Sequence, residues 1–362
     1  VDNASSDESL VELHGFPRVN VLSQPMNLGF AGGANVGLAA VETTFVLLLN
    51  PDVEVEPDVG QRLVDAFDRD ARLGAVGPLL LYPDSGLIQH AGGVVERPLM
   101  TTRHLHYREP IPEQLNGRTV DFVTGGAMGL RMDALRGVGD FDERYSPVYY
   151  EDVDLCFRLR EAGWDVRFDP ALRAVHHEGV TLEQSTSYFR FLHRNRVRFA
   201  LDHLSPGEWR REFVPAEIER ITHELAVLPH DTIEQSGAGG IELLLRGVEG
   251  REGWNSYSAL RDDAFHRLRD PLNELRERHR VAFDTSQRGA LGGLWDKAQR
   301  QVISTLNRAM ADQQAFNSAV VAAFEQQDRI NRAQTADVLL IALDLLGRIR
   351  MDDGGTASPP AD

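Results

Sequence analysis

Short apolar runs alternate with amphipathic stretches over the first half of the chain. Phe45–Leu49 is a continuous apolar run of strand length, which is typical of a strand buried on both faces of a sheet. Val59–Arg69 has the spacing of an amphipathic helix, and Ala75–Leu81 is a second apolar run. With shorter runs at Val19–Leu22 and Trp164–Phe168, this alternation predicts an α/β fold with a mainly parallel sheet flanked by helices. Ligands of such sheets bind at the carboxyl ends of the strands.

Further helices are expected where apolar residues recur at three- and four-residue spacing. They lie at Gly33–Val41, near Asp133–Arg136 and over Glu151–Gly163, and a short helix is expected to begin at a capping box that starts at Ser5. Residues 82–120 are irregular and rich in His, Pro and Gly. We expect them to form a loop or a small hairpin over the sheet edge.

The character of the sequence changes after residue 205. Residues 206–350 are polar and helix-forming, with a long amphipathic helix expected at about 295–327, and residues 351–362 are expected to be a disordered tail. The predicted organisation is an α/β domain over 1–205 followed by an α-helical extension without a catalytic constellation. Packing on the first domain, homo-oligomerisation through the long helix and peripheral contact with a membrane all stay open, although a membrane-surface helix normally has a basic polar face.

Composition narrows the class of protein. The 362 residues exceed the usual range of one domain, so two units are expected, and 42% hydrophobic residues suffice for a sizeable core. The net charge of -17 argues against nucleic acid as a partner and means that an anionic ligand needs a local cation. The single cysteine, Cys156, fits a reducing, cytoplasmic compartment. The apolar runs are far shorter than the roughly 20 residues that span a bilayer.

A first candidate site follows the most apolar strand. Asn50-Pro51-Asp52 comes directly after Phe45–Leu49, where a carboxylate would point into the ligand crevice of an α/β sheet. Asp52 could hold a divalent cation there. The alternative is a turn in which Asp52 acts only as a capping residue, and the residues alone leave both open.

A second candidate site opens a helix. Glu151, Asp152 and Asp154 fall in its first turn, where the helix dipole favours acids, so capping alone would explain one or two of them. The aromatic residues Tyr149 and Tyr150 precede them and could raise the pKa of a carboxylate toward that of a general base.

One further residue could bind a metal, and several common nucleotide-binding and hydrolase motifs are absent from the sequence. His176 follows a strand-like segment and could be an imidazole ligand of the same cation, although a histidine in a loop is more often solvated. The glycines of Asn27–Asn35 do not have the G-x-G-x-x-G spacing, and neither a P-loop nor a G-x-S-x-G motif occurs. Dinucleotide-binding, P-loop and common hydrolase classes are therefore disfavoured.

Seven short motifs follow one another in a specific order. They are Val1–Asp7, Asn27–Asn35, Leu49–Asp52, Gly125–Ala127, Gly139–Glu143, Tyr150–Arg158 and Val175–Gly179. Together they resemble the family 2 inverting glycosyltransferases of GT-A fold, and within these the rhamnosyltransferase-like enzymes of polysaccharide assembly. The resemblance covers about residues 1–205.

The resemblance implies a role for each matching residue on the donor side. Asp2 matches the aspartate that reads the pyrimidine base of the nucleotide sugar, and Asn27 lies in a motif on the same side. Asp52 matches the last acid of the D-x-D motif that binds Mg²⁺ or Mn²⁺, and His176 matches a metal-ligating histidine of some members. Asn50 replaces the first acid of that motif, which leaves one fewer negative charge near the metal.

On the acceptor side, the resemblance implies that Asp152 is the catalytic base, with the adjacent Glu151 as the alternative candidate for that role. Gly125 and Gly126 match the loop where the acceptor approaches the sugar, and Asp154 lies on the same substrate side. The implied function is metal-assisted inverting transfer of a sugar from dTDP-rhamnose or a UDP-sugar to a hydroxyl of a growing polysaccharide or lipid-linked glycan. Bacterial cell-wall assembly in the cytoplasm, at the inner face of the plasma membrane, is the implied setting.

Two further expectations follow. The alternative function is a catalytically silent GT-A scaffold whose helical tail assembles other glycan-synthesis proteins. Compared with the family, the chain is also expected to begin at the end of the second strand, without the first strand and helix. A chain without that central strand is expected to bind donor poorly and to be unstable alone.

Overall fold

The computed structural model describes residues 1–13, 15–177, 186–227, 241 and 343. The chain divides into two compact units, the first formed by Val1–Glu217 with Glu234–Leu244 and the second by Ile218–Ile233 with Leu245–Asp362. Nearly all described residues belong to the first unit. The helix expected at 295–327 and the tail at 351–362 lie outside the described residues.

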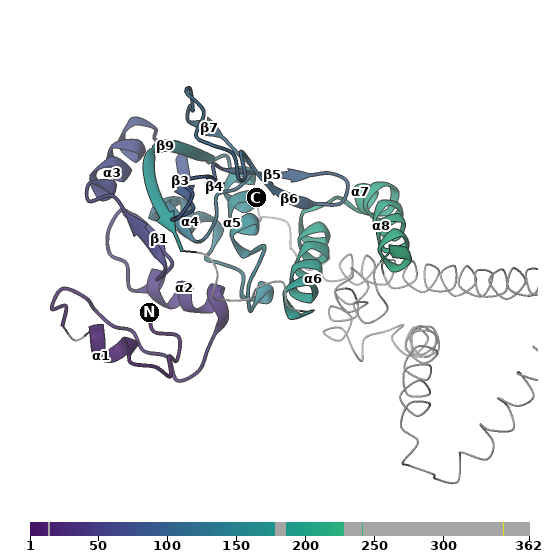
Figure 1. Ribbon diagram of the computed structural model, residues 1–362. Helices are drawn as coiled ribbons and strands as arrows, with labels where there is room; N and C mark the ends of the chain where they lie inside the picture. The colour runs from purple at the N-terminus through teal and green to yellow at the C-terminus, as the bar shows by residue number, and fades with distance from the viewer. Residues whose placement is uncertain (14, 178–185, 228–240, 242–342, 344–362) are drawn as a thin grey trace, which may run out of the picture. The chain divides into compact units, whose positions relative to one another are not determined.

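A seven-stranded mixed sheet forms the centre of the first unit (Figure 1). Five strands follow the order β1-β8-β3-β9-β2, while β4 pairs with β3 and β7 pairs with β9. Only β3 and β9 are parallel neighbours among the described strands. The strands are β1 (Phe45–Leu49), β2 (Val53–Val55), β3 (Leu73–Leu81), β4 (Ile88–His90), β7 (Arg118–Thr119), β8 (Ala127–Arg131) and β9 (Asp165–His176).

The expectation of a mainly parallel sheet is therefore corrected to a mixed one. The described chain between β3 and β8 contains short strands and turns but no crossover helix, so β8 enters the sheet at the edge where β1 ends, with Ala127 opposite Leu49. A parallel neighbour would need a crossover back to the opposite edge. The apolar run over Ala127–Arg131 indicates burial but does not specify strand direction.

The predicted helices pack on this sheet and form its core. The helix α3 (Val59–Arg69) has the predicted bounds, and α2 (Gly29–Ala39), α4 (Met132–Val138) and α5 (Glu151–Glu161) confirm the other three within a few residues. Phe67 of α3 stacks on Phe45 of β1 with 4.6 Å between ring centroids. The Arg131 guanidinium lies over both rings and donates to the carbonyl oxygen of Leu73, which ties β8 to the start of β3.

Residues 82–120 contain the expected small hairpin, whereas the strand expected at Val19–Leu22 is absent from the described structure and the expected first helix begins later than predicted. The hairpin consists of β5 (Gly93–Glu96) and β6 (Thr101–His104).

Val19–Leu22 is not a strand, because the described pairing there is one bridge between Asp2 and Ser23. The first helix, α1 (Ser9–Leu13), begins after Ser5, and the Asp7 carboxylate accepts a hydrogen bond from the backbone N–H of Ser9.

Four helical segments follow the last strand in the described part of the chain. They are α6 (Thr186–His203), α7 (Pro206–Glu208), one π-helical turn η2 (Trp209–Phe213) and α8 (Val214–Val227). A short 3-10 helix, η1 (Glu143–Tyr145), lies earlier, between α4 and α5. None of the described helices is long and apolar enough to cross a membrane.

Candidate active site

Three segments that are distant in the sequence meet where β1 ends. The backbone N–H of Asn50 donates to the carbonyl oxygen of Gly126 at 2.9 Å, and that of His177 donates to the carbonyl oxygen of Asp52 at 2.9 Å. The register of β2 with β9 places Val53 opposite His176. The turn after β1, the glycine pair before β8 and the end of β9 are therefore neighbours in the fold.

Asp52 and His176 present ligand atoms to each other. His176 Nε2 lies 3.2 Å from Asp52 Oδ1, yet this buried oxygen has no hydrogen-bond partner among the described residues. Adjacent ligands of an octahedral ion that binds oxygen at about 2.1 Å are about 3 Å apart, which matches this spacing. The pair thus fits the carboxylate and imidazole ligands of a divalent cation.

The described residues supply only part of a coordination sphere. No group of three or more His, Cys, Asp or Glu side chains in the described ranges could hold a metal ion. Mg²⁺ is commonly held by one or two protein groups together with substrate phosphates and water, so a pair is sufficient for that kind of site. Asn50 lies beside the pair, since a Cβ added at Gly126 would be 3.7 Å from Asn50 Nδ2 and 3.5 Å from His176 Cε1.

Asp152 approaches the same glycine pair from the first turn of α5. Its Oδ2 accepts from the backbone N–H of Gly125 and its Oδ1 from that of Val153, both at 2.8 Å. Burial raises the pKa of Asp152, although these two N–H groups and the nearby His104 act in the opposite direction. The result is a half-buried, oriented carboxylate whose pKa is shifted toward that of a general base.

Glu151 differs sharply from its neighbour. It is 5% exposed, and its Oε2 has no hydrogen-bond partner among the described residues. Burial, followed by the charge of Asp152, raises the pKa of Glu151 well above its usual value. Asp152 is therefore the better placed of the two acids to receive a proton from a bound molecule.

The loop before α5 has a strained backbone that side chains of α6 hold, among them Arg194, which donates to the carbonyl oxygens of Tyr145 and Ser146. Tyr149 and Tyr150 have φ angles of 81° and 72°, a region that residues other than glycine rarely adopt. The buried Asn195 side chain on α6 donates to the carbonyl oxygens of Tyr145, Val148 and Tyr149 at 2.6, 2.9 and 2.8 Å. Sequence reasoning missed Asn195, because no motif marks a residue that holds the backbone carbonyls of a distant loop.

Asp154 faces away from the glycine pair. Its Oδ2 accepts from Arg158 Nε and its Oδ1 from His203 Nε2, each at 2.8 Å, and the residue is 3% exposed. Both oxygens are thus engaged in linking α5 to itself and to α6. The expected contact of Asp154 with substrate gains no support from this arrangement, which is that of a structural acid.

Asp2 and Asn27 belong to a second cluster beside α2. The Asp2 carboxylate accepts from the backbone N–H of Ser5, and the Asn27 side chain accepts from the backbone N–H of Gly29 at 2.8 Å and from Asn3 Nδ2 at 3.1 Å. Asn3 was not singled out from the sequence, although it lies inside the first motif. These contacts shape the loop that enters α2, where the resemblance puts the nucleotide.

Two residues of the irregular segment also escaped the sequence analysis. Gln89 Oε1 lies 2.7 Å from His176 Nδ1, and the Gln89 carbonyl oxygen lies 3.3 Å from His104 Nδ1. Gln89 thus contacts the metal side of the site through its side chain and His104, near Asp152, through its backbone. No spacing or motif in residues 82–120 indicated either contact.

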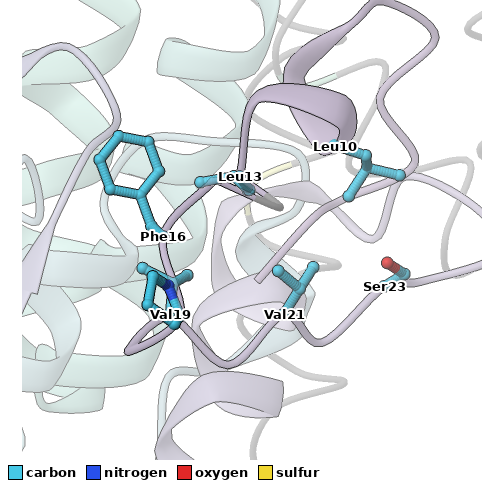
Figure 2. Close-up of a pocket in the computed structure, with 7 residues that line it drawn as sticks. Leu10, Leu13, Phe16, Val19, Val21 and Ser23 are labelled. Carbon is cyan, nitrogen blue, oxygen red and sulfur yellow. The ribbon is translucent and has the colours of Figure 1, made fainter.

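A separate hollow of about 340 Å³ lies beside α1 (Figure 2). No charged side chain is found among the residues that line it, so it lacks the groups that would bind a pyrophosphate. Its lining consists of Leu10, Leu13, Phe16, Pro17, Val19, Val21 and Ser23.

Comparison with known proteins shows the family of the chain. The model of the family described as Glycosyl transferase family 2 matches residues 1–139. The N-acetylglucosaminyl-diphospho-decaprenol L-rhamnosyltransferase of Mycobacterium tuberculosis is 30% identical over 238 residues, covering 58% of this chain and 75% of the relative. The chain belongs to glycosyl transferase family 2. The resemblance inferred from the seven motifs is thus confirmed, and the chain is a glycosyltransferase.

Other relatives of this family 2 glycosyltransferase include rhamnosyltransferase WbbL of Escherichia coli, which is 27% identical over 192 residues, covering 47% of this chain and 72% of the relative. Among solved structures, a crystal structure of GalNAc-T7 with UDP, GalNAc and Mn²⁺ is similar with a TM-score of 0.46 and 15% identity, covering 70% of this chain and 51% of that one.

Proposed function

We propose that the protein transfers a sugar, with inversion and with the help of a divalent cation, from dTDP-rhamnose or a UDP-sugar to a hydroxyl of a growing cell-surface polysaccharide or lipid-linked glycan. The names of two relatives, both rhamnosyltransferases, support rhamnose as the sugar. The name of the mycobacterial relative also supports a lipid-linked acceptor. Such an acceptor would place the reaction at the cytoplasmic face of the plasma membrane, in bacterial cell-wall assembly.

The main support for the proposal is that an oriented carboxylate, Asp152, and a pair of possible metal ligands, Asp52 and His176, lie near the same two glycines. Asp152 accepts a hydrogen bond from Gly125, whereas Asn50 and His176 lie beside Gly126. His176 in turn lies 3.2 Å from Asp52. An inverting transfer needs a base on the acceptor side and stabilisation of the leaving group on the other. The two halves of this site supply these two functions.

In the proposed mechanism, the oxygen of the acceptor hydroxyl attacks the anomeric carbon of the sugar. An Asp152 carboxylate oxygen takes the proton of that hydroxyl at the same time. The bond to the nucleoside diphosphate breaks on the opposite face, so no covalent intermediate with the chain is needed. Asp52 and His176 would hold Mg²⁺ or Mn²⁺, which offsets the charge of the leaving diphosphate. This matters in a protein whose net charge is -17.

The test is Asp152→Asn, which keeps the shape of the side chain but removes the base. We expect the rate of sugar transfer to fall by about 10²–10⁴-fold, measured by product formation over a panel of nucleotide sugars. Binding of the nucleoside diphosphate with Mn²⁺ should persist. Asp140→Asn, at an exposed acid outside the site, is the matched control. Wild-type turnover by Asp152→Asn would show that Asp152 is not the base.

A further inference from the structure

We propose that Gln89 is a positioning residue for His176, which it orients so that the Nε2 lone pair is available to a cation shared with Asp52. The inference rests on the proposed metal-assisted function and adds a residue to it. Gln89 lies on β4, 87 positions from His176 in the sequence, and is 4% exposed.

The contact between the two side chains selects one form of the ring. Gln89 Oε1 lies 2.7 Å from His176 Nδ1, and an amide oxygen can only accept a hydrogen bond. The proton of the neutral imidazole is therefore on Nδ1, which leaves the lone pair on Nε2. Metal-binding histidines generally donate their other ring N–H to an acceptor of this kind.

The Asp52 side of the ring also fits a shared cation. Asp52 Oδ1 is only 3.2 Å from Nε2, yet it has no hydrogen-bond partner among the described residues. Two facing electron-pair donors at this distance suit a shared cation.

The backbone around Gln89 holds its side chain in place. Ile88 donates through its N–H to the carbonyl oxygen of Glu109 at 2.9 Å and accepts from the N–H of Arg108 at 2.7 Å, while His90 is paired with Leu80 in the sheet. The Gln89 carbonyl oxygen contacts His104 Nδ1 at 3.3 Å. Because β4 is fixed at both neighbours, the Gln89 amide is already in position before a cation binds.

The experiment measures binding of Mn²⁺ alone to the full chain by electron paramagnetic resonance of the free ion. Gln89→Met keeps the length of the side chain but removes the acceptor, and we expect it to weaken Mn²⁺ binding by about 10–100-fold. Gln89→Glu restores an acceptor and should bind Mn²⁺ much as the wild type does. Gln61→Leu, on the exposed face of α3, is the control and should change nothing.

A double-mutant cycle separates positioning from general stability. If Gln89 acts through His176, Gln89→Met with His176→Ala should bind Mn²⁺ no more weakly than His176→Ala alone. Should Gln89→Met fail to fold, Gln89→Asn tests the same contact, because it withdraws the amide by one methylene.

The two proposals can fail separately. Wild-type affinity for Mn²⁺ in Gln89→Met, together with weakened binding in His176→Ala, would overturn the role of Gln89 and leave the proposed function intact. Binding that is unchanged by both His176→Ala and Asp52→Asn, or absent from the wild type, would overturn the proposed cation site and the Gln89 role with it.

Discussion

Asn50 illustrates how a single residue tunes the site. The resemblance to the family puts it at the first acid of the motif that ends at Asp52, and its amide lies near Gly126, as His176 does. An amide has no charge, so a cation held by Asp52 and His176 loses the attraction of one carboxylate. The substitution weakens the charge of the site without removing the ligand pair.

We therefore predict that Asn50→Asp strengthens Mn²⁺ binding. A second carboxylate beside Asp52 adds an attractive charge at short range in a half-buried position, and the affinity should rise severalfold in a Mn²⁺ titration. Asn116→Asp adds the same charge at an exposed position and should leave the affinity unchanged. Equal or weaker binding by Asn50→Asp would mean that the amide is itself the preferred group.

The two adjacent glycines of the site differ in how much space surrounds them. A Cβ added at Gly125 would lie 2.7 Å from Phe30 Cζ, whereas one at Gly126 would have ordinary contacts of 3.5 Å or more. Gly125 also donates the hydrogen bond that orients Asp152. The first glycine is therefore required by packing, whereas the surroundings of the second leave room for a Cβ.

Alanine at each position gives a matched test. Gly125→Ala should lower the free energy of unfolding by about 1–3 kcal/mol, as overpacking does in well-packed regions, because Phe30 must move. Gly126→Ala should cost clearly less in the same denaturant titration. Equal losses would indicate that backbone conformation, rather than the close approach of Phe30, makes glycine necessary.

At the scale of elements, α5 and α6 are joined by a buried cluster of charged groups. His203 Nε2 contacts Asp154 at 2.8 Å and its Nδ1 contacts Glu161 at 3.2 Å, while Arg158 binds the other Asp154 oxygen. Burial alone would lower the pKa of His203, but the hydrogen bond and charge of Asp154, with those of Glu161, raise it above the usual value. This cluster orients α5, which carries Asp152.

The raised pKa of His203 predicts the direction of a pH effect. A group whose folded-state pKa exceeds its unfolded value of about 6.5 contributes its full stability below that pH and loses it as the pH rises through the folded-state pKa. The difference in melting temperature between the wild type and His203→Gln should therefore be largest near pH 6 and shrink above the raised pKa. A difference that grows with pH would contradict the assignment.

At the scale of the first unit, one buried ion pair ties the helices that follow the sheet to the β5–β6 hairpin. Arg196 on α6 contacts Glu217 at 2.5 Å, with side chains that are 2% and 0% exposed, and donates to the carbonyl oxygen of Leu99 in the hairpin turn. A charge left alone in such surroundings is strongly destabilising.

We predict that Glu217→Ala lowers the free energy of unfolding by about 3–5 kcal/mol, because Arg196 is left buried and unpaired. Glu212→Ala, at an exposed acid in the π-helical turn, is the control. Replacement of both partners by Met and Leu should recover much of the loss, since apolar pairs often substitute for buried ion pairs. Denaturant titrations measure all three, and a loss below about 1 kcal/mol would show that water reaches the pair.

The sequence by itself determined most of the helices and long strands, and the family. Apolar spacing is a local property, so α3, β1 and the acids that open α5 were read correctly, and seven ordered motifs identified family 2. The tertiary structure decided which partners meet. A pattern records that a residue is buried but not what it faces, and the contacts of Gln89 with His176 and of Asn195 with Tyr145 span 87 and 50 positions. For the same reason the antiparallel direction of β8 and the inward-facing Asp154 emerged only from the fold, because each depends on where distant segments return to the sheet.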